Sequence, residues 1–194
     1  KPIFYNEKKG SAQCKSAVIL GGMRVEGNTK IKAKKSRNHT ELLLKYLEYP
    51  IKIKKMKEYD IIKIKGLNQF SSFDYKVPGD ISSASFFIVL TLLSQNSQLI
   101  IKNININPSR TGILKILNKM NAKIKIFNKK NYKGEYVGDV KIKSSNNLKS
   151  INCHESLNSS AIDEFLLIFL VAAKSKGISK FSNLGELNKK ESPR

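Results

Sequence analysis

The sequence predicts an α/β fold of the α+β repeat type, in which each unit follows the order helix, strand, helix, strand, strand. Segments with an apolar residue at every third or fourth position alternate with short segments in which apolar residues and lysines alternate. The same order occurs twice and begins a third time, with Arg37 and Arg110 at matching places. Such self-similarity is typical of a repeat architecture, and polar residues that depart from the repeat are the first candidates for function.

The first copy begins with a helix whose start is marked by Ser11, a residue type that commonly caps helices. Asn38, with Glu41 three positions later, marks the second helix in the same way. Isoleucine and lysine alternate in the strands that follow, so we expect helices on one face of a sheet whose other face stays polar. The strands expected in this copy lie near residues 29–31, 52–54 and 62–65.

The second copy runs from Asp80 to Lys143, and the third begins near Ala161. Asp80 follows a Pro-Gly pair and is expected to cap a helix. Ser160 and Asp163 are three positions apart and read as a capping box, which predicts that a helix begins there. The remaining expected elements are a helix at 109–117 and strands at 98–101, 123–127, 139–143 and 178–181.

The predicted domain boundary lies within residues 70–80, where the periodicity lapses and a Pro-Gly pair occurs. We therefore expect two parts, residues 1–76 and residues 77–194. The chain begins at Lys1 without a methionine and ends at Arg194, where a helix would begin. This predicts an internal piece of a longer protein.

The chain is strongly basic, with 36 Lys+Arg against 15 Asp+Glu and a formal net charge of +21. Such a chain attracts anionic partners. The lysines are spread over strands and helices and are not gathered with aromatic residues in one stripe. This favours solvated lysines with a local anion site, and a nucleic-acid-binding face remains the alternative.

Cysteine content and hydropathy bound the cellular setting. Cys14 and Cys153 are too few for a disulfide framework and lack the spacing of a zinc site, so a reducing cytosol is expected. Both are expected to be packing residues. The apolar runs fall short of the roughly 20 residues that a membrane-crossing helix needs, which predicts a soluble protein.

Two predicted helix starts carry groups that suit a phosphate. Backbone N–H groups and the positive end of the helix dipole favour an anion at Ser11, Ala12 and Gln13. Arg37, before the next helix, adds a guanidinium that can bind phosphate through two N–H groups. Taken alone, a serine at this position is more often a cap than a ligand.

Two further candidates lie near the end of the chain. Asp163 breaks the repeat, because neutral residues stand at the matching places, and its carboxylate could act as a general base. The alternative is a first-turn acid that favours the helix dipole. Lys190 and Arg194 share one helical face, with Glu191 beside them, as a binding group or as an ordinary salt-bridged surface turn.

Six motifs follow one another along the chain, at residues 10–17, 36–41, 77–84, 107–112, 162–164 and 190–192. In this order they resemble the motifs of the 5-enolpyruvylshikimate-3-phosphate synthase family, and most closely those of its bacterial group with a serine-alanine-glutamine motif. The resemblance implies the enolpyruvyl transferase fold, with βαβαββ units assembled as an inside-out α/β barrel in two domains. Residues 1–76 would be the last unit of the first domain, and residues 77–194 one complete and one truncated unit of the second.

The resemblance also implies the activity. The family transfers the enolpyruvyl group of phosphoenolpyruvate to the 5-hydroxyl of shikimate 3-phosphate and releases phosphate, on the shikimate pathway to chorismate and the aromatic amino acids. It implies no metal or organic cofactor, small anionic substrates, no nucleic-acid or membrane partner, a cytoplasmic location and a monomer when full length.

Residue roles follow from the matching motifs. Asp163 and Glu191 would be catalytic, Asp163 taking the hydroxyl proton and Glu191 moving protons to and from the methylene carbon. Phosphoenolpyruvate would contact Gln13 and Arg194. The residues implied to bind shikimate 3-phosphate are Ser11, Ala12, Gln13, Arg37, Asp163 and Lys190.

The sequence departs from the family pattern at Asn38, Asn188 and Pro193, where the family usually has aspartate, arginine and aspartate. The family's amino-terminal lysine-serine pair and arginines, and its carboxy-terminal arginine, have no counterpart here, so we expect this piece alone to be inactive. The alternatives are a UDP-sugar enolpyruvyl transferase, whose reactive-cysteine loop is not seen, and a basic nucleic-acid-binding repeat protein.

Overall fold

Helices and strands alternate along the chain in two compact units. The structure is a computed structural model that describes residues 1–185 and 187–189. The first unit contains residues 1–76 together with the short stretch 133–135, and the second contains residues 77–132 and the chain from 136 onward. Each unit has a hydrophobic core of its own.

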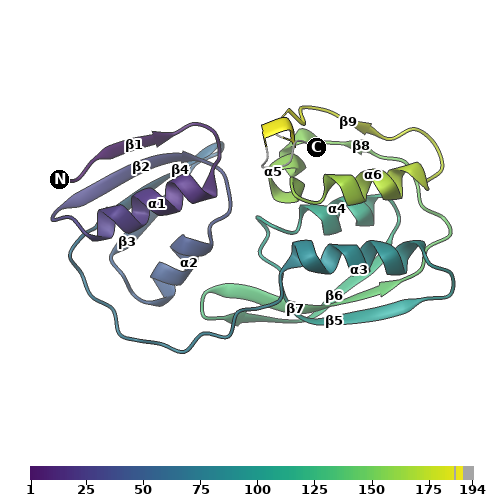
Figure 1. Ribbon diagram of the computed structural model, residues 1–194, viewed down its shortest axis with the longest axis horizontal. Helices are drawn as coiled ribbons and strands as arrows, with labels where there is room; N and C mark the ends of the chain where they lie inside the picture. The colour runs from purple at the N-terminus through teal and green to yellow at the C-terminus, as the bar shows by residue number, and fades with distance from the viewer. Residues whose placement is uncertain (186, 190–194) are drawn as a thin grey trace. The chain divides into compact units, whose positions relative to one another are not determined.

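The first unit is a four-stranded sheet in the order β1-β2-β4-β3 with two helices (Figure 1). β1 runs parallel to β2, and the other two pairings are antiparallel. Both helices pack on one face, because Ile19 of α1 and Leu44 of α2 share a core with Ile31 and Ile62 of the sheet. Its elements are β1 (Phe4–Glu7), α1 (Ala12–Met23), β2 (Asn28–Lys34), α2 (His39–Tyr46), β3 (Ile51–Lys55) and β4 (Tyr59–Lys65).

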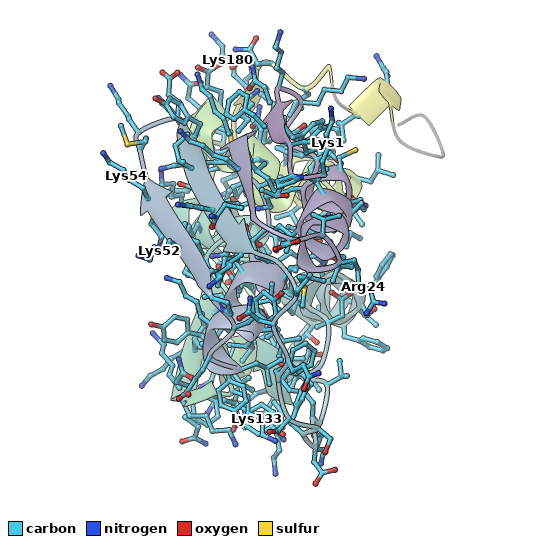
Figure 2. The ribbon with its side chains drawn as sticks, turned by 90° about the vertical axis from the view of Figure 1, so that its left-hand side faces the viewer. Lys1, Arg24, Lys52, Lys54, Lys133 and Lys180 are labelled. Carbon is cyan, nitrogen blue, oxygen red and sulfur yellow. The ribbon has the colours of Figure 1, made fainter. Side chains whose placement is uncertain are left out.

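The outer face of this sheet carries a grid of lysines that we call the lysine face. Lys63 of β4 lies directly opposite Lys30 of β2 on one side and Lys52 of β3 on the other. Figure 2 shows Lys52 and Lys54 pointing away from the side on which α1 lies. The expected alternation is confirmed, but the lysines are gathered more closely than the sequence suggested. The lysine face consists of Lys30, Lys32, Lys34, Lys52, Lys54, Lys63 and Lys65.

The second unit places its helices between two sheets (Figure 1). Residues of α3, α4 and α6, among them Ile88, Leu117 and Ile168, form one core with residues of β5 and β7. The described strands form sheets of four, three and two strands, so no closed barrel is present in this part of the chain. The elements are α3 (Ile81–Leu93), β5 (Gln98–Asn105), α4 (Gly112–Lys119), β6 (Lys123–Tyr132), β7 (Glu135–Lys143), β8 (Asn152–Cys153), η1 (Glu155–Leu157), α5 (Asn158–Ala161), α6 (Phe165–Ala173), β9 (Lys180–Phe181) and η2 (Leu187–Lys189).

The predicted helix start at Ser160 is wrong. Ser160 lies inside α5, where its hydroxyl donates to the Leu157 carbonyl at 2.9 Å. The axes of Glu155–Ala161 and Phe165–Ala173 differ by 119°. We call the three residues between α5 and α6, 162–164, the elbow. The helix therefore ends and a second one starts where the sequence pattern suggested a single beginning.

Tertiary packing explains the elbow. α5 crosses the first turn of α4 at Gly112, where a Cβ atom would lie 2.4 Å from the Ser160 hydroxyl and 2.8 Å from the Ala161 Cβ. Only glycine allows this approach. A capping pattern read locally does not contain this contact, so the packing overrides it.

The two cysteines differ in their surroundings. Cys153 is buried in the core of the second unit, as expected, and burial raises the pKa of its thiol. Cys14 is exposed on α1, so its prediction as a packing residue is wrong. In the described part of the chain, no single helix is long and apolar enough to cross a membrane. The bent pair of Glu155–Ala161 and Phe165–Ala173 has the length and apolar composition of a membrane-crossing segment only when both are counted together.

Candidate active site

The first part of the candidate site is the start of α1. Ser11 caps this helix, and its hydroxyl accepts a hydrogen bond from the Cys14 N–H at 3.2 Å. The buried carboxylate of Glu7 accepts the N–H groups of Lys9 and Gly10 at 2.8 and 2.7 Å. Gly10 has a φ of +79°, which glycine adopts without strain. The turn that delivers Ser11, Ala12 and Gln13 to the helix start is therefore tied to β1.

A buried ion pair joins this helix start to the start of α2. The Lys15 ammonium lies 2.6 Å from Glu41 Oε1, and both side chains are 2–3% exposed. The same ammonium donates to the Arg37 carbonyl at 2.7 Å. A hydrogen bond of 2.7 Å between the hydroxyls of Ser16 and Thr40 adds a second link.

These links place the Arg37 backbone and the start of α2 beside the first turns of α1. Two neighbouring helix N-termini, with an arginine just before one of them, are an arrangement that favours a phosphate or carboxylate. Sequence reasoning missed Lys15 and Glu41. The available signal was a lysine four positions before Ile19, on the helix face that packs against the sheet, where only a paired charge is tolerated.

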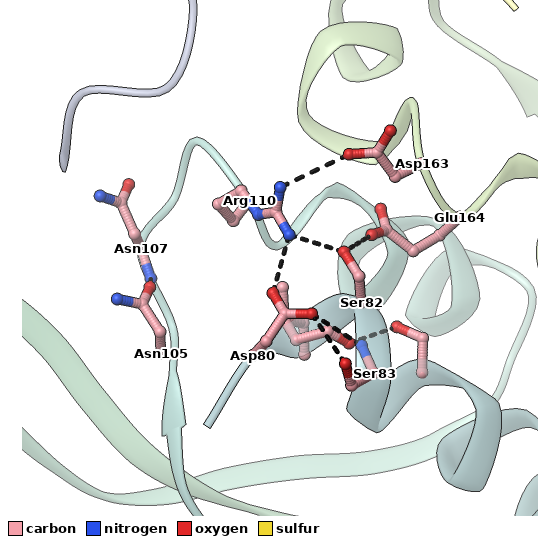
Figure 3. Close-up of polar contacts among 10 residues, drawn as sticks. Asp80, Ser82, Ser83, Asn105, Asn107, Arg110, Asp163 and Glu164 are labelled. Carbon is pink, nitrogen blue, oxygen red and sulfur yellow. Dashed lines mark hydrogen bonds and ion pairs between the residues drawn. The ribbon is translucent and has the colours of Figure 1, made fainter. Parts of the chain in front are cut away.

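The second part of the candidate site lies in the second unit, around Arg110 (Figure 3). The Arg110 Nη2 donates to Asp80 Oδ1 at 2.9 Å and to the Ser82 hydroxyl at 2.6 Å. Its Nη1 lies 3.5 Å from Asp163 Oδ2. Ser82 in turn donates to Glu164 Oε1. We call these five residues the elbow cluster, because they connect the elbow to the start of α3.

Local structure fixes the arginine in this cluster. Asn105 and Asn107 each accept backbone N–H groups two residues ahead, at 2.9 Å, and so shape the turn that leads from β5 to Arg110. Asp80 caps α3 by accepting the Ser83 N–H at 2.9 Å. Burial opposes ionisation of Asp80, but the Ser83 N–H and the Arg110 charge outweigh it and lower the pKa of this carboxyl.

The predicted site residues are therefore found in two groups. Ser11, Ala12, Gln13 and Arg37 lie at the paired helix starts of the first unit, and Asp163 lies at the elbow of the second. The sequence suggested that Asp163 lies in the first turn of a helix. The structure instead places it between α5 and α6. The predicted residues that lie outside the described part of the chain are Lys190, Glu191 and Arg194.

Solved structures with a similar fold define the class. The chain matches an EPSP synthase from Acinetobacter baumannii with a TM-score of 0.88 and 34% identity, covering 100% of this chain and 43% of that one. It also matches the enolpyruvyl transferase NikO from Streptomyces tendae with a TM-score of 0.68 over 91% of this chain and 43% of that one. At 13% identity the second likeness shows the fold alone. The fold is that of the enolpyruvyl transferases, as predicted.

Sequence comparison narrows the class to one family. The profile described as EPSP synthase (3-phosphoshikimate 1-carboxyvinyltransferase) matches residues 1–194, and the chain belongs to this family. A protein of Petrotoga mobilis named 3-phosphoshikimate 1-carboxyvinyltransferase is 42% identical over 100% of this chain and 44% of its own length. One of the same name from Legionella pneumophila (strain Corby) is 42% identical over 99% and 43%. The chain thus spans less than half of the relatives' length, and the resemblance inferred from the motifs is confirmed.

Proposed function

We propose that the protein containing this chain transfers the enolpyruvyl group of phosphoenolpyruvate to the 5-hydroxyl of shikimate 3-phosphate, with release of phosphate. The observation that carries the proposal is the Lys15 link between α1 and α2, which brings the serine-alanine-glutamine turn and Arg37 together. Family membership supports the same substrates. The curated relatives favour this function over a UDP-sugar transferase or a nucleic-acid-binding protein.

In this proposal the first unit holds the phosphate of shikimate 3-phosphate. Ser11 and the backbone N–H of Ala12 bind its oxygens, and Arg37 neutralises its charge. Gln13 follows on α1 and has an amide that can both donate and accept, so it contacts shikimate 3-phosphate and phosphoenolpyruvate. Lys190 and Arg194 supply further cations for the two anionic substrates.

The chemistry is an addition followed by an elimination. The oxygen of the 5-hydroxyl bonds to the enol carbon while Asp163 takes the hydroxyl proton. Glu191 gives a proton to the methylene carbon. The resulting tetrahedral intermediate expels phosphate while Glu191 removes a proton from the new methyl group, which restores the double bond. Atoms and electrons balance without a metal ion or an organic cofactor.

The proposal also assigns the two parts of the chain. Residues 1–76 are the last repeat unit of one globular domain, and residues 77–194 are one complete and one truncated unit of the other. The relatives carry more than half of their length outside the matched region. Any substrate-binding residues that this additional length contributes are absent from this chain. We infer that the chain alone is inactive and that the longer protein works as a cytoplasmic monomer.

The test is phosphate release from phosphoenolpyruvate that depends on shikimate 3-phosphate, measured on the longer protein. We expect Asp163→Ala and Glu191→Ala each to lower kcat by about a hundredfold or more, since each removes a proton-transfer group. Glu26→Ala, at an exposed loop residue of the first unit, is the matched control and should leave kcat unchanged. A folded wild-type protein that releases no phosphate would refute the function.

A further inference from the structure

We propose that Arg110 is a positioning residue that fixes the orientation of the Asp163 carboxylate for proton transfer. The proposal rests on the function proposed above, in which Asp163 takes the hydroxyl proton. Arg110 acts through Asp163 and is assigned no contact with either substrate. Its basis is the elbow cluster, a set of contacts that joins three separate parts of the second unit.

Asp163 lies in the elbow, between the last residue of α5 and the first residue of α6. Its side chain is 26% exposed. A general base must lie within hydrogen-bond reach of the proton that it removes, and a displacement of about an ångström costs much of the rate. A contact that fixes the direction of the carboxylate therefore bears directly on the rate.

Arg110 has the properties of such a group. Its side chain is only 12% exposed, and it is anchored by Asp80 at 2.9 Å and by Ser82 at 2.6 Å, both at the start of α3. These two bonds use Nη2, so Nη1 is directed toward Asp163. A planar guanidinium held at one end presents its remaining N–H groups in a fixed direction. Arg110 thus connects the Asp163 carboxylate to the start of α3, a helix of the core.

A second tether supports the same assignment. Glu164, the next residue of the elbow, is 3% exposed and accepts a hydrogen bond from Ser82, the serine that also binds Arg110. Asp163, through Arg110, and Glu164, through Ser82, are therefore both connected to the start of α3. Arg110 pairs directly with two carboxylates, Asp80 and Asp163, so a neutral replacement leaves these two negative charges without their shared counterion.

Conservative and neutral substitutions should separate positioning from simple packing. Lysine keeps the charge but has no rigid fork, so it cannot contact Asp80, Ser82 and Asp163 together. In the longer protein we expect Arg110→Gln to lower kcat at least tenfold and Arg110→Lys to fall between it and the wild type. The KM for phosphoenolpyruvate should stay within threefold, because Asp163 is assigned no contact with this substrate. Lys115→Gln, on the exposed face of α4, is the control and should change kcat less than twofold.

A double-mutant cycle with Asp163→Asn gives the decisive readout. If Arg110 acts through Asp163, adding Arg110→Gln to Asp163→Asn should cost less than twofold in single-turnover rate. A full tenfold cost in that background, or a change confined to KM, would overturn the proposal. If Arg110→Gln does not fold, as judged by circular dichroism, the same cycle is run with Arg110→Lys. Near wild-type rates for Asp163→Asn alone would instead refute the proposed base, whatever Arg110 does.

Discussion

At the residue scale, the buried pair of Lys15 and Glu41 is the feature that most constrains the first unit. Two charges that are almost fully buried are tolerated when each neutralises the other and when their remaining hydrogen-bonding groups are satisfied. Lys15 is neutralised by Glu41 and also donates to the Arg37 carbonyl, whereas the second carboxylate oxygen of Glu41, Oε2, is buried and has no hydrogen-bond partner among the described residues. Removing one partner leaves the other charge buried without compensation, which is more damaging than replacing both.

We therefore predict that Lys15→Met lowers the free energy of unfolding by about 3 kcal/mol, measured by urea unfolding of the longer protein. In steady-state kinetics it should raise the KM for shikimate 3-phosphate, because the Arg37 backbone loses its anchor. Lys45→Met, at an exposed position of α2, is the control and should stay within about 0.5 kcal/mol of the wild type. A stability loss without any change in KM would show that the pair serves the fold alone.

The candidate site illustrates what residue patterns can and cannot reveal. Ser11 and Arg37 were found because helix-start chemistry is local in sequence. Lys15 was missed because its partners lie 22 or more residues away, Glu41 on α2 and Arg37 just before that helix. Arg110 was noticed only as a feature of the repeat and as part of the motif at residues 107–112, because its bond to Ser82 and its pairing with Asp163 depend on how α3, the turn after β5 and the elbow pack.

At the scale of elements, the strands were predicted well because the alternation of isoleucine and lysine reports burial directly. The elbow was not, because Ser160 and Asp163 satisfy a local capping rule that the crossing of α5 over α4 overrides. Gly112 is the residue that makes this crossing possible.

Gly112→Ala should lower the free energy of unfolding by about 1–3 kcal/mol, since the added methyl group overlaps Ser160 and Ala161. The matched control is Gly21→Ala in α1. A Cβ there meets nothing within 4 Å, so alanine should stabilise by about 0.5–1 kcal/mol through helix propensity. Thermal unfolding of the two variants should shift in opposite directions; a neutral Gly112→Ala would mean that α5 can move away from α4 at little cost.

The lysine face carries an electrostatic cost. Lys63 has a lysine directly opposite on both neighbouring strands. Lys63→Thr should therefore raise the free energy of unfolding by about 0.5 kcal/mol at low salt, with a smaller gain at 1 M salt. Lys65→Thr is the control on the same strand, because Lys65 lies opposite Asn28. Equal effects for both variants would show that net charge matters and that cross-strand register does not.

At the scale of the whole molecule, the second unit exposes apolar side chains on two helices that contact each other, α3 and α6. Exposed apolar surfaces of this kind favour association in water. They are also where the additional length of the relatives could pack. The exposed apolar residues on these two helices are Phe86, Phe87, Leu90, Leu166 and Leu170.

We predict that the 194-residue chain, purified alone, associates at micromolar concentration and releases no phosphate. Light scattering measures the first property and the phosphate assay the second. Leu90→Lys with Leu166→Lys should reduce association without restoring activity, while Leu67→Lys, an exposed leucine of the first unit, is the matched control. A monomeric, active chain would contradict both the exposed faces and the assignment of missing groups to the rest of the protein.

The exposure of Cys14 has a practical consequence. It lies in the first turn of α1 beside Gln13, while the other thiol of this chain, Cys153, is buried with a raised pKa. A maleimide fluorophore added at neutral pH should therefore label Cys14 selectively within these residues. Its emission would follow the arrival of an anion at the helix start in real time, so that binding to the first unit can be observed separately from turnover.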